Sequence, residues 1–442
     1  MRVMKFGGAV LKNESGFEAM RQVLGQSKGP LLLVVSALGT ATSDLQRAAR
    51  RAELGDEQEA LALADKIVAK HLKFTQTLLR DQRTGEAIGM LLEDYARRLR
   101  DMLRGVAITM ELTDRTLDAI LSFGEYFAVR IVKHYLDEAG FNIGFADACD
   151  IIATDETHLA ARALRDESRQ KVSEKLLPMF DRFNIVITQG FVGRSREGNI
   201  TTMGMESSNF SATLLGELLE ARDVTIWTDV EGVRSGDPKL VSSTRSIPRL
   251  SYRQASSAAL NGVKLLHPRM ISPAERAGIP IIFRSAFRPE GEFTTVGPDE
   301  ARDHAPIVGC TEPVTLVQVN RRPGEMPLFD NSDARTLFPD GTDVIAVTQR
   351  HDALTVVAGG KARLQNHKNI DVAAVRHNYA YISLVNVRPQ RAFGLIAGLD
   401  HDIFRMEPPM LEIGAPQNIA ALTVPRRLMT QLVTELHSAL CP

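Results

Sequence analysis

Apolar runs alternate with amphipathic stretches along the first 297 residues. The runs are short and nearly continuous, which suits parallel strands covered on both faces. Six are predicted as strands: Arg2–Phe6, Pro30–Ala37, Asn142–Ala148, Asn184–Thr188, Val224–Thr228 and Ile279–Phe283. Helical spacing between them predicts helices at Gly16–Leu24, Leu117–Ala139, Glu156–Lys175, from Ser208 onward, at Tyr252–Asn261 and at Met270–Ala277. Such alternation predicts an α/β fold with a mainly parallel central sheet.

One segment of this region breaks the alternation. From about residue 43 to residue 104 the chain is rich in Ala, Leu, Glu, Lys and Arg and nearly free of proline. These are strong helix formers. We therefore expect two or three long helices that form a lid or cap rather than part of the sheet.

The pattern changes after a stretch rich in proline and glycine between Arg288 and Pro306, which is typical of a linker. Short strands are predicted beyond it at Val314–Val319, Asp343–Thr348, Leu354–Ala358, Ala380–Val387 and Asn418–Val424, with helices at Gln390–Leu399 and Arg426–Leu440. The order after Tyr379 is that of a ferredoxin-like βαββα unit. The predicted domains are 1–297, a shortened α+β module at 306–370 and a second module at 371–442.

The charge balance narrows the classes of partner. Across 442 residues, 53 Lys and Arg face 54 Asp and Glu, which argues against a general nucleic-acid or anionic-membrane surface. The three cysteines are far apart and indicate neither a zinc site nor a disulfide framework. No apolar run reaches about 18 residues. These features favour a cytoplasmic protein that acts on a small molecule.

The stretch Thr201–Ala212 is the strongest candidate for a ligand cradle. It combines the end of a hairpin, a polar turn and the start of an apolar-spaced helix near Ser208. The first turn of a helix has unpaired N–H groups and the positive end of the macrodipole, so it can bind an anion. An ordinary capped surface helix is the alternative, and this stretch alone favours that alternative.

Other candidate residues are weak taken singly. Lys5 at a strand end precedes Gly7 and Gly8, whose backbone could approach a phosphate, although this run alone favours a tight turn with a solvated lysine. Asp237-Pro238-Lys239 fits a nucleotide loop or a plain turn, and Lys264 offers a second ammonium. Glu125 lies on an apolar helix face, where a carboxylate needs a cationic partner unless its head reaches water.

Taken in order, these pieces resemble the aspartokinases of the amino acid kinase family. The matching segments are Val3–Gly8, Val34–Ala37 with Thr42, Ser122–Glu125, Thr188–Gly193, Ile200–Gly204, Ile226–Val233, Asp237–Lys239 and Gly262–Pro268. Each motif is modest, but the ordered set is specific and covers 1–297. The resemblance implies the family's three-layer α/β sandwich, followed by paired ACT modules in the C-terminal region.

The resemblance also implies a reaction and roles. The γ-phosphate of ATP, with Mg²⁺, would pass to the side-chain carboxylate of L-aspartate, the first step toward lysine, threonine and methionine. No protein residue is assigned as a metal ligand. The implied roles are phosphate contacts for Lys5, Lys264, Gly7 and Gly8, substrate contacts for Ser36, Thr42, Glu125, Gly204 and Ser208, and nucleotide contacts for Thr228, Asp229, Asp237 and Lys239.

The cradle departs from the family pattern at three positions. Met205 stands where an arginine binds the α-carboxylate of aspartate, and methionine has no donor for it. Glu206 replaces a glycine, and Asn209 replaces an aspartate that orients the catalytic lysines. Three interpretations remain open: Arg194 or Arg196 takes over the carboxylate, the substrate differs, or the chain is an impaired regulatory protein. The first is our working hypothesis.

The C-terminal modules leave their role open as well. The segment Asn320–Pro327 contains two prolines, where ACT modules that bind effectors usually have a small-residue turn. This departure argues against feedback inhibition by an amino acid. The alternative is that the modules mainly pair subunits through helices such as Arg426–Leu440, which predicts a homodimer or a higher homo-oligomer.

Overall fold

The computed structural model describes residues 1–204, 207–298, 305–320, 334, 337–338, 342–349, 353–364, 371–399, 410–414 and 418–441. The chain divides into two compact units. The first contains Met1–Gly232 and Arg269–Pro298, and the second contains Val233–Pro268 and Asp299–Pro442. Residues Val233–Pro268, which precede the predicted linker, thus group with the C-terminal region.

The first unit is built on a mainly parallel sheet with the strand order β3-β5-β2-β1-β8-β10-β11. The bounds are β1 Arg2–Phe6, β2 Leu31–Val35, β3 Ile143–Phe145, β5 Ile185–Gln189, β8 Val224–Thr228, β10 Ile281–Ser285 and β11 Phe293–Gly297. All neighbours pair in parallel except β10 with β11. Phe6 pairs with Val35, and Val35 pairs with Gln189, so these strands end at one edge of the sheet. The predicted parallel sheet is confirmed.

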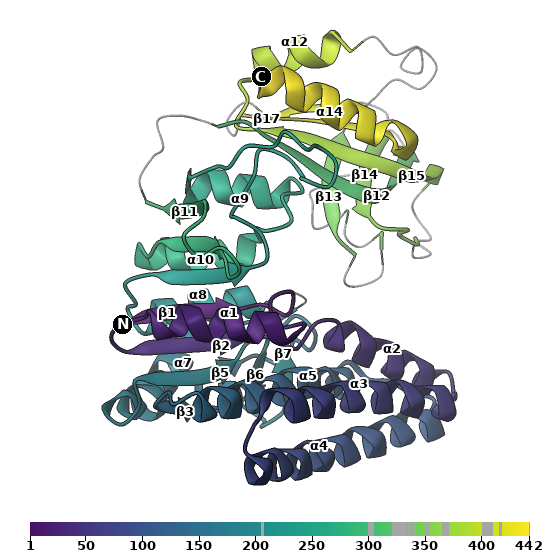
Figure 1. The fold of residues 1–442 in the computed structure, drawn as a ribbon. Coiled ribbons are helices and arrows are strands. Elements are labelled where there is room, and N and C mark those ends of the chain that lie inside the picture. Colours follow the sequence, from purple (N-terminus) through teal and green to yellow (C-terminus); the bar gives the residue numbers. More distant parts are fainter. Residues whose placement is uncertain are drawn as a thin grey trace. The chain divides into compact units, whose positions relative to one another are not determined.

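Helices cover both faces of this sheet, as expected for three layers (Figure 1). Helix α8 (Ser208–Leu218) packs so closely that a Cβ on Gly216 would lie 2.6 Å from Val224 of β8 and 3.9 Å from Val3 of β1. The ring of Phe17 in α1 (Glu14–Gly25) contacts that of Tyr135 in α5 (Asp114–Glu138). None of the helices in the described part of the chain is long and apolar enough to cross a membrane.

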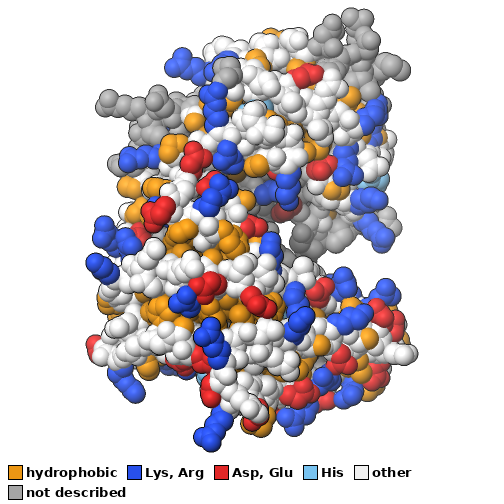
Figure 2. All heavy atoms as spheres, in the orientation of Figure 1, with side chains coloured by type: hydrophobic (Ala, Val, Ile, Leu, Met, Phe, Trp, Pro, Cys, Tyr) orange, Lys and Arg blue, Asp and Glu red, His pale blue; other side chains and the backbone are white. Residues whose placement is uncertain are grey.

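The predicted lid is a bundle of three helices, α2 (Ala41–Glu53), α3 (Glu57–Leu78) and α4 (Gln82–Thr109). Leu63, Leu92 and Leu99 are among its buried residues. Ion pairs such as Arg100 with Asp65, at 2.8 Å, join α4 to α3. Figure 2 shows acidic and basic side chains interspersed on the face of this region that it draws. The lid therefore presents mixed charge rather than a field of one sign.

One predicted helix is only partly correct. The first part of the predicted span Glu156–Lys175 forms a loop, and the helix begins at Arg165 as α7 (Arg165–Lys171), which continues into a π-helical turn at Val172–Leu176. The loop follows β4 (Ala153–Thr154), which pairs in a small sheet with β6 (Val192–Ser195) and β7 (Ile200–Thr202). Within the loop Leu159 has φ +64, and its N–H donates to Asp118 of α5. A distant carboxylate thus overrides the local helical spacing.

The second unit contains an antiparallel sheet with the order β13-β14-β12-β15-β17-β16. The bounds are β12 Ile307–Asn320, β13 Val344–Gln349, β14 Ala353–Gly359, β15 Asp371–Val385, β16 Met410–Gly414 and β17 Ile419–Pro425. Two helices, α12 (Pro389–Ala397) and α14 (Met429–Leu440), share a core with β12, β15 and β17. The predicted α+β character of this region is confirmed, while the segment Arg321–Pro327 lies outside the described residues.

The segment Val233–Pro268 packs into this second unit. It carries β9 (Arg249–Ser251) and α9 (Tyr252–Leu260), and Val241 belongs to the same core as α14. The Ser235 hydroxyl lies 2.8 Å from Nε2 of the buried His437, and the Ser235 carbonyl accepts from the N–H of Val308. The loop before Asp237 is therefore fixed by the C-terminal sheet and helix.

Acid should weaken the first unit through His71 of α3. The imidazole is 1% exposed and its Nδ1 lies 2.7 Å from the carbonyl oxygen of Ile67, and burial lowers its pKa from 6.5 to about 4. Since the unfolded chain binds the proton first, the free energy of unfolding should fall as the pH drops from 6.5 toward 4, by about 3 kcal/mol. Acid unfolding followed by circular dichroism should show a smaller fall for His71→Phe than for the wild type.

The exposed Lys73→Gln, two residues further along α3, is the control and should keep the acid sensitivity of the wild type. An acid transition of equal size in the wild type and in His71→Phe would contradict this assignment.

Candidate active site

Three loops meet at the carboxyl edge of the parallel sheet in the first unit. The N–H of Ser36, after β2, donates to the carbonyl of Phe6 at 3.3 Å. The N–H of Gly190, after β5, donates to the carbonyl of Val35 at 2.8 Å. Ligands of open α/β sheets bind at this edge. Ser36 thus lies beside the Lys5–Gly8 segment, and Thr42 follows in the first turn of α2.

Glycines bring these loops into backbone contact. A Cβ on Gly8 would lie 2.5 Å from the carbonyl oxygen of Ala37, and one on Gly190 would lie 2.7 Å from Cβ of Ser208. No side chain fits at either position. The loop after β1 therefore rests on the loop after β2, and the start of α8 rests on the loop after β5.

Lys5 is buried at the end of β1, with 8% of its surface exposed. Its ammonium lies 3.1 Å from the point that a Cβ on Gly7 would occupy. The alternative of a solvated lysine at a plain turn is therefore wrong. The arrangement places a cation directly over a glycine backbone, which suits an anionic phosphate group.

Glu125 is buried in the middle of α5, with 2% of its surface exposed. One carboxylate oxygen accepts from the N–H of Ala37 at 3.3 Å, and the other, Oε2, has no hydrogen-bond partner among the described residues. Burial raises the pKa of this carboxyl from 4.5 to about 8, while the ammonium of Lys5 acts in the opposite direction. The alternative of a water-exposed glutamate is wrong. An unpaired buried carboxylate oxygen is poised for a cation.

The start of α8 offers further polar groups. Ser207 immediately precedes the helix, yet its side chain makes no capping hydrogen bond. Its hydroxyl, the side-chain oxygen of Asn209 and the hydroxyl of Thr188 in β5 are buried and have no hydrogen-bond partner in the described part of the chain. Ser208, which lies between Ser207 and Asn209 in the sequence, is also buried. Buried polar atoms are normally paired, so these groups are fit to meet a ligand.

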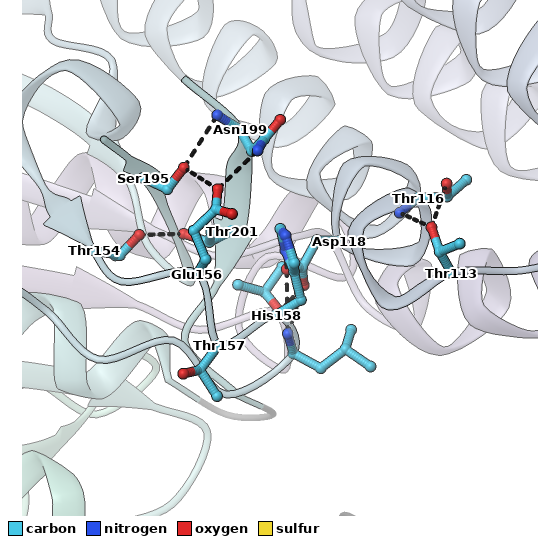
Figure 3. Close-up of polar contacts among 12 residues, drawn as sticks. Thr113, Thr116, Asp118, Thr154, Glu156, Thr157, His158, Ser195, Asn199 and Thr201 are labelled. Atoms are coloured by element: carbon cyan, nitrogen blue, oxygen red, sulfur yellow. Dashed lines mark hydrogen bonds and ion pairs between the residues drawn. The ribbon is translucent and has the colours of Figure 1, made fainter. Parts of the chain in front are cut away.

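The strand that leads into this helix is held by Asp118 of α5 (Figure 3). The buried carboxylate accepts from the hydroxyl of Thr202 at 2.5 Å and from the N–H of Leu159 at 3.1 Å, and it lies 2.7 Å from Nδ1 of His158. Burial raises its pKa, and the hydrogen bonds from Thr202 and His158 oppose that shift. Sequence reasoning missed Asp118, although it precedes Glu125 by two helical turns.

A second residue that the sequence did not single out is Arg269 of α10 (Pro268–Ala277). Its Nη1 donates to the carbonyl of Met203 at 2.8 Å, and its guanidinium lies 6.0 Å from the ring centre of Phe210 in α8. Arg269 therefore contacts Met203, which follows β7, and Phe210, which lies in the first turn of α8. Two residues of this turn, Met205 and Glu206, lie outside the described residues.

The loop after β8 carries two of the predicted nucleotide residues. The hydroxyl of Thr228 donates to the carboxylate of Asp229 at 3.3 Å, and Lys12 lies 3.8 Å from that carboxylate. Both residues follow the strand next to β1, so they lie at the same edge of the sheet as Lys5.

The remaining predicted residues belong to the second unit. The ammonium of Lys264 lies 3.7 Å from the carboxylate of Asp237, and the N–H of Lys239 donates to Asp237 at 2.9 Å. Gly262 is required near Lys264, because a Cβ there would lie 2.7 Å from the hydroxyl of Thr311. Asp237, Lys239 and Lys264 thus form one cluster of basic and acidic residues within this unit.

Comparison with known proteins finds a matching family model and several relatives of this chain. Residues 1–285 match the model of the amino acid kinase family. The aspartokinase of Chlamydia pneumoniae is 32% identical over 66% of this chain and 62% of its own length. Aspartokinase 2 of Arabidopsis thaliana, a chloroplastic protein, is 27% identical over 99% of this chain and 84% of its own length.

A longer relative and a solved structure are also similar to this chain. A bifunctional aspartokinase/homoserine dehydrogenase of Zea mays is 30% identical over 71% of this chain, and the match spans only 34% of that relative. The structure of E. coli aspartokinase III in complex with aspartate and ADP covers all of both chains with a TM-score of 0.82 at 23% identity. At that identity the likeness establishes the fold.

Proposed function

The chain belongs to the amino acid kinase family, and we propose that it is an aspartokinase. It would transfer the γ-phosphate of ATP to the side-chain carboxylate of L-aspartate and give 4-phospho-L-aspartate. The observation that carries the proposal is Glu125. Its buried carboxylate, unpaired at Oε2 and influenced by the charge of Lys5, suits the ammonium of an amino acid beside a phosphate site.

Phosphoryl transfer depends mainly on how the protein positions the reactants and neutralises the phosphate charge. We propose that Lys5 neutralises phosphate oxygens and that the backbone at Gly7 and Gly8 cradles the transferred group, because Gly8 is pressed against Ala37 and leaves no side chain in the way. Bound Mg²⁺ supplies further neutralisation of the phosphates. Lys264 is proposed for phosphate oxygens, as Lys5 is, and Thr228, Asp229, Asp237 and Lys239 are proposed for the nucleotide.

The substrate is proposed to bind among groups of opposite character. Glu125 would pair with the ammonium, and Ser36 and Thr42 would bind near it. The positive end of α8, with Ser208 in its first turn and Gly204 before it, would face an anionic group. Asn209 would contribute a hydrogen bond where the family has a charged carboxylate.

A coupled assay tests the proposal. Purified protein with Mg-ATP, L-aspartate and hydroxylamine should yield aspartyl hydroxamate, because the acyl phosphate product is attacked by hydroxylamine. The rate should exceed that of a Lys5→Ala control by about 10³-fold. No hydroxamate above that control would overturn the proposal.

Two departures support a second candidate, an amino-acid kinase with another substrate or a binding protein without turnover. Met205 removes a donor and Glu206 adds a negative charge in the turn before α8. Screening other amino acids in the same assay identifies an altered substrate. Tight ATP and amino-acid binding without product from any of them would favour the regulatory alternative.

We also propose an assembly and a location for the protein. The paired α+β modules favour a homodimer or higher homo-oligomer, which light scattering at several protein concentrations measures. We propose a cytoplasmic location, with no nucleic-acid or membrane partner, on the balanced charge of the chain.

A further inference from the structure

The loop Ser235–Lys239 rests on the buried side chain of His437 in α14. The imidazole is completely buried, and its Nε2 lies 2.8 Å from the hydroxyl of Ser235. A Cβ on Gly236 would lie 3.1 Å from Cδ2 of the same ring. Two successive residues of the loop therefore contact one imidazole, and the residue that follows them is Asp237.

Ser235 is held on its other sides by backbone groups. Its N–H donates to the carbonyl of Arg245, and its hydroxyl accepts from the N–H of Arg245, both at 2.8 Å. Its carbonyl accepts from the N–H of Val308 in β12, also at 2.8 Å. The hydroxyl thus connects the loop to α14, while the main chain connects it to β12. A displaced imidazole would release only the first of these connections.

The groups proposed for ATP follow directly from this anchor. The carboxylate of Asp237 accepts from the N–H of Lys239 at 2.9 Å and lies 3.7 Å from the ammonium of Lys264. The position of Asp237 therefore affects two lysines, one in its own loop and one in another. Binding groups must be held close to their productive geometry, so a small shift of this loop should weaken binding.

The loop that carries Lys264 has its own support on the same sheet. The carbonyl of Asn261 accepts from the hydroxyl of Ser383 in β15 at 2.5 Å, and a Cβ on Gly309 of β12 would overlap that carbonyl oxygen. This support does not involve His437. A change at His437 should therefore act on the Asp237 loop and leave the Lys264 loop in place.

We propose that His437 is a positioning residue for the nucleotide, which acts by holding Ser235 and Gly236 so that Asp237 and Lys239 face the bound ATP. The inference rests on the proposed function, which assigns those two residues to the nucleotide. It gives α14 a second role besides its packing in the C-terminal core, because the affinity for ATP then depends on a side chain of this helix.

The test measures the Kd for Mg-ATP by titration calorimetry on the 442-residue protein. His437→Leu keeps an apolar side chain in the core and should raise this Kd by roughly 3- to 10-fold, the range for one lost hydrogen bond. His437→Gln should bind nearly as well as wild type, since its amide can donate or accept near the position of Nε2.

A double-mutant cycle ties the effect to the contact with the loop. Ser235→Ala should raise the Kd about as much as His437→Leu, and the double variant should be no weaker than the weaker single variant. Multiplied effects in the double variant would contradict the inference. Should His437→Leu fail to fold, Ser235→Ala compared with wild type decides the same point. The exposed Ser438→Ala, next to His437 on α14, is the control and should bind Mg-ATP as wild type does.

Steady-state kinetics separate positioning from a general loss of structure. In His437→Leu the KM for ATP should rise, while the KM for aspartate should stay near the wild-type value. Equal rises in both KM values, or a His437→Gln variant as weak as His437→Leu, would assign the effect to packing and overturn the inference. A wild-type Kd in folded His437→Leu would overturn it as well.

The binding experiment also distinguishes this inference from the proposed function. If wild type binds Mg-ATP but forms no product from aspartate, the aspartokinase proposal fails, and the Kd values still decide the role of His437. If wild type phosphorylates aspartate and the variants bind Mg-ATP as tightly as it does, the inference alone fails. If wild type binds no Mg-ATP, both are wrong.

Discussion

Replacing Glu125 with glutamine is expected to lower kcat/KM for aspartate by about 100-fold or more, because the amide cannot neutralise the substrate ammonium at a buried position. The side chain is 2% exposed and nearly isosteric with glutamine, so the packing of α5 should survive. Most of the loss should appear in KM for aspartate. Initial rates at varied aspartate and saturating Mg-ATP measure it.

The pH dependence follows from the same carboxyl. Its pKa in the free protein is raised to about 8 by burial, so at pH 7 most molecules carry a proton there. Only the ionised form pairs with an ammonium, so kcat/KM should fall about tenfold for each pH unit below 8. Calorimetry in buffers of different ionisation enthalpy should record a proton released when aspartate binds at pH 7. Glu125→Gln should show neither effect.

As the pH rises, the free energy of unfolding should fall while activity increases. A carboxyl whose folded-state pKa is raised contributes stability that is present below the unfolded value of 4.5 and is lost as the pH rises through about 8. Glu125→Gln should therefore melt at a higher temperature than wild type at pH 9. The exposed Glu59→Gln on the lid is the control and should match the wild type. A Glu125→Gln enzyme with wild-type KM for aspartate would contradict the assigned role.

The parallel sheet could be predicted because its strands are buried on both faces. Val3, Leu32 and Val224 are completely buried, and short continuous runs of such residues between amphipathic stretches are typical of parallel strands. The lid helices were equally predictable from their composition. Element bounds agree within a few residues for β1, β2, β8 and α8.

The loop between β4 and α7 could not be predicted, since its shape depends on a residue far away in the sequence. Asp118 binds Leu159 and Thr202 from α5, and no local pattern in Glu156–Arg165 reports that contact. The same holds for Arg269. Its position beside His267-Pro268 suggests only a helix start, and its contact with Met203 exists only in the folded chain.

Candidate site residues divide in the same way. Lys5 and Glu125 were found from their setting at a strand end and on an apolar helix face, yet whether each was buried or solvated needed the structure. The sequence motifs also placed Asp237 and Lys264 in the kinase segment. Asp237 and Lys264 nevertheless belong to the second unit, because Val233–Pro268 contacts strands much later in the sequence.

Removing the ammonium of Lys5 should have the largest effect on turnover. Lys5→Ala is expected to lower kcat by about 10³-fold, because the group sits over the glycine backbone where phosphate charge would develop. Lys5→Arg should not restore activity, since a larger guanidinium would replace an ammonium that is buried beside Gly7. The matched control is Lys12→Ala, which removes a half-exposed ammonium paired with Asp229 and should cost far less.

The charge of Lys5 influences the pKa of Glu125. This influence can be measured without turnover. Lys5 holds the pKa of Glu125 below the value that burial alone would impose. In Lys5→Ala the carboxyl should bind its proton more tightly, so aspartate binding at pH 8 should release more protons than in wild type. Unchanged proton release in Lys5→Ala would mean that Lys5 and Glu125 do not act on the same bound substrate, whereas an increase together with lost turnover ties phosphate and ammonium recognition to one site.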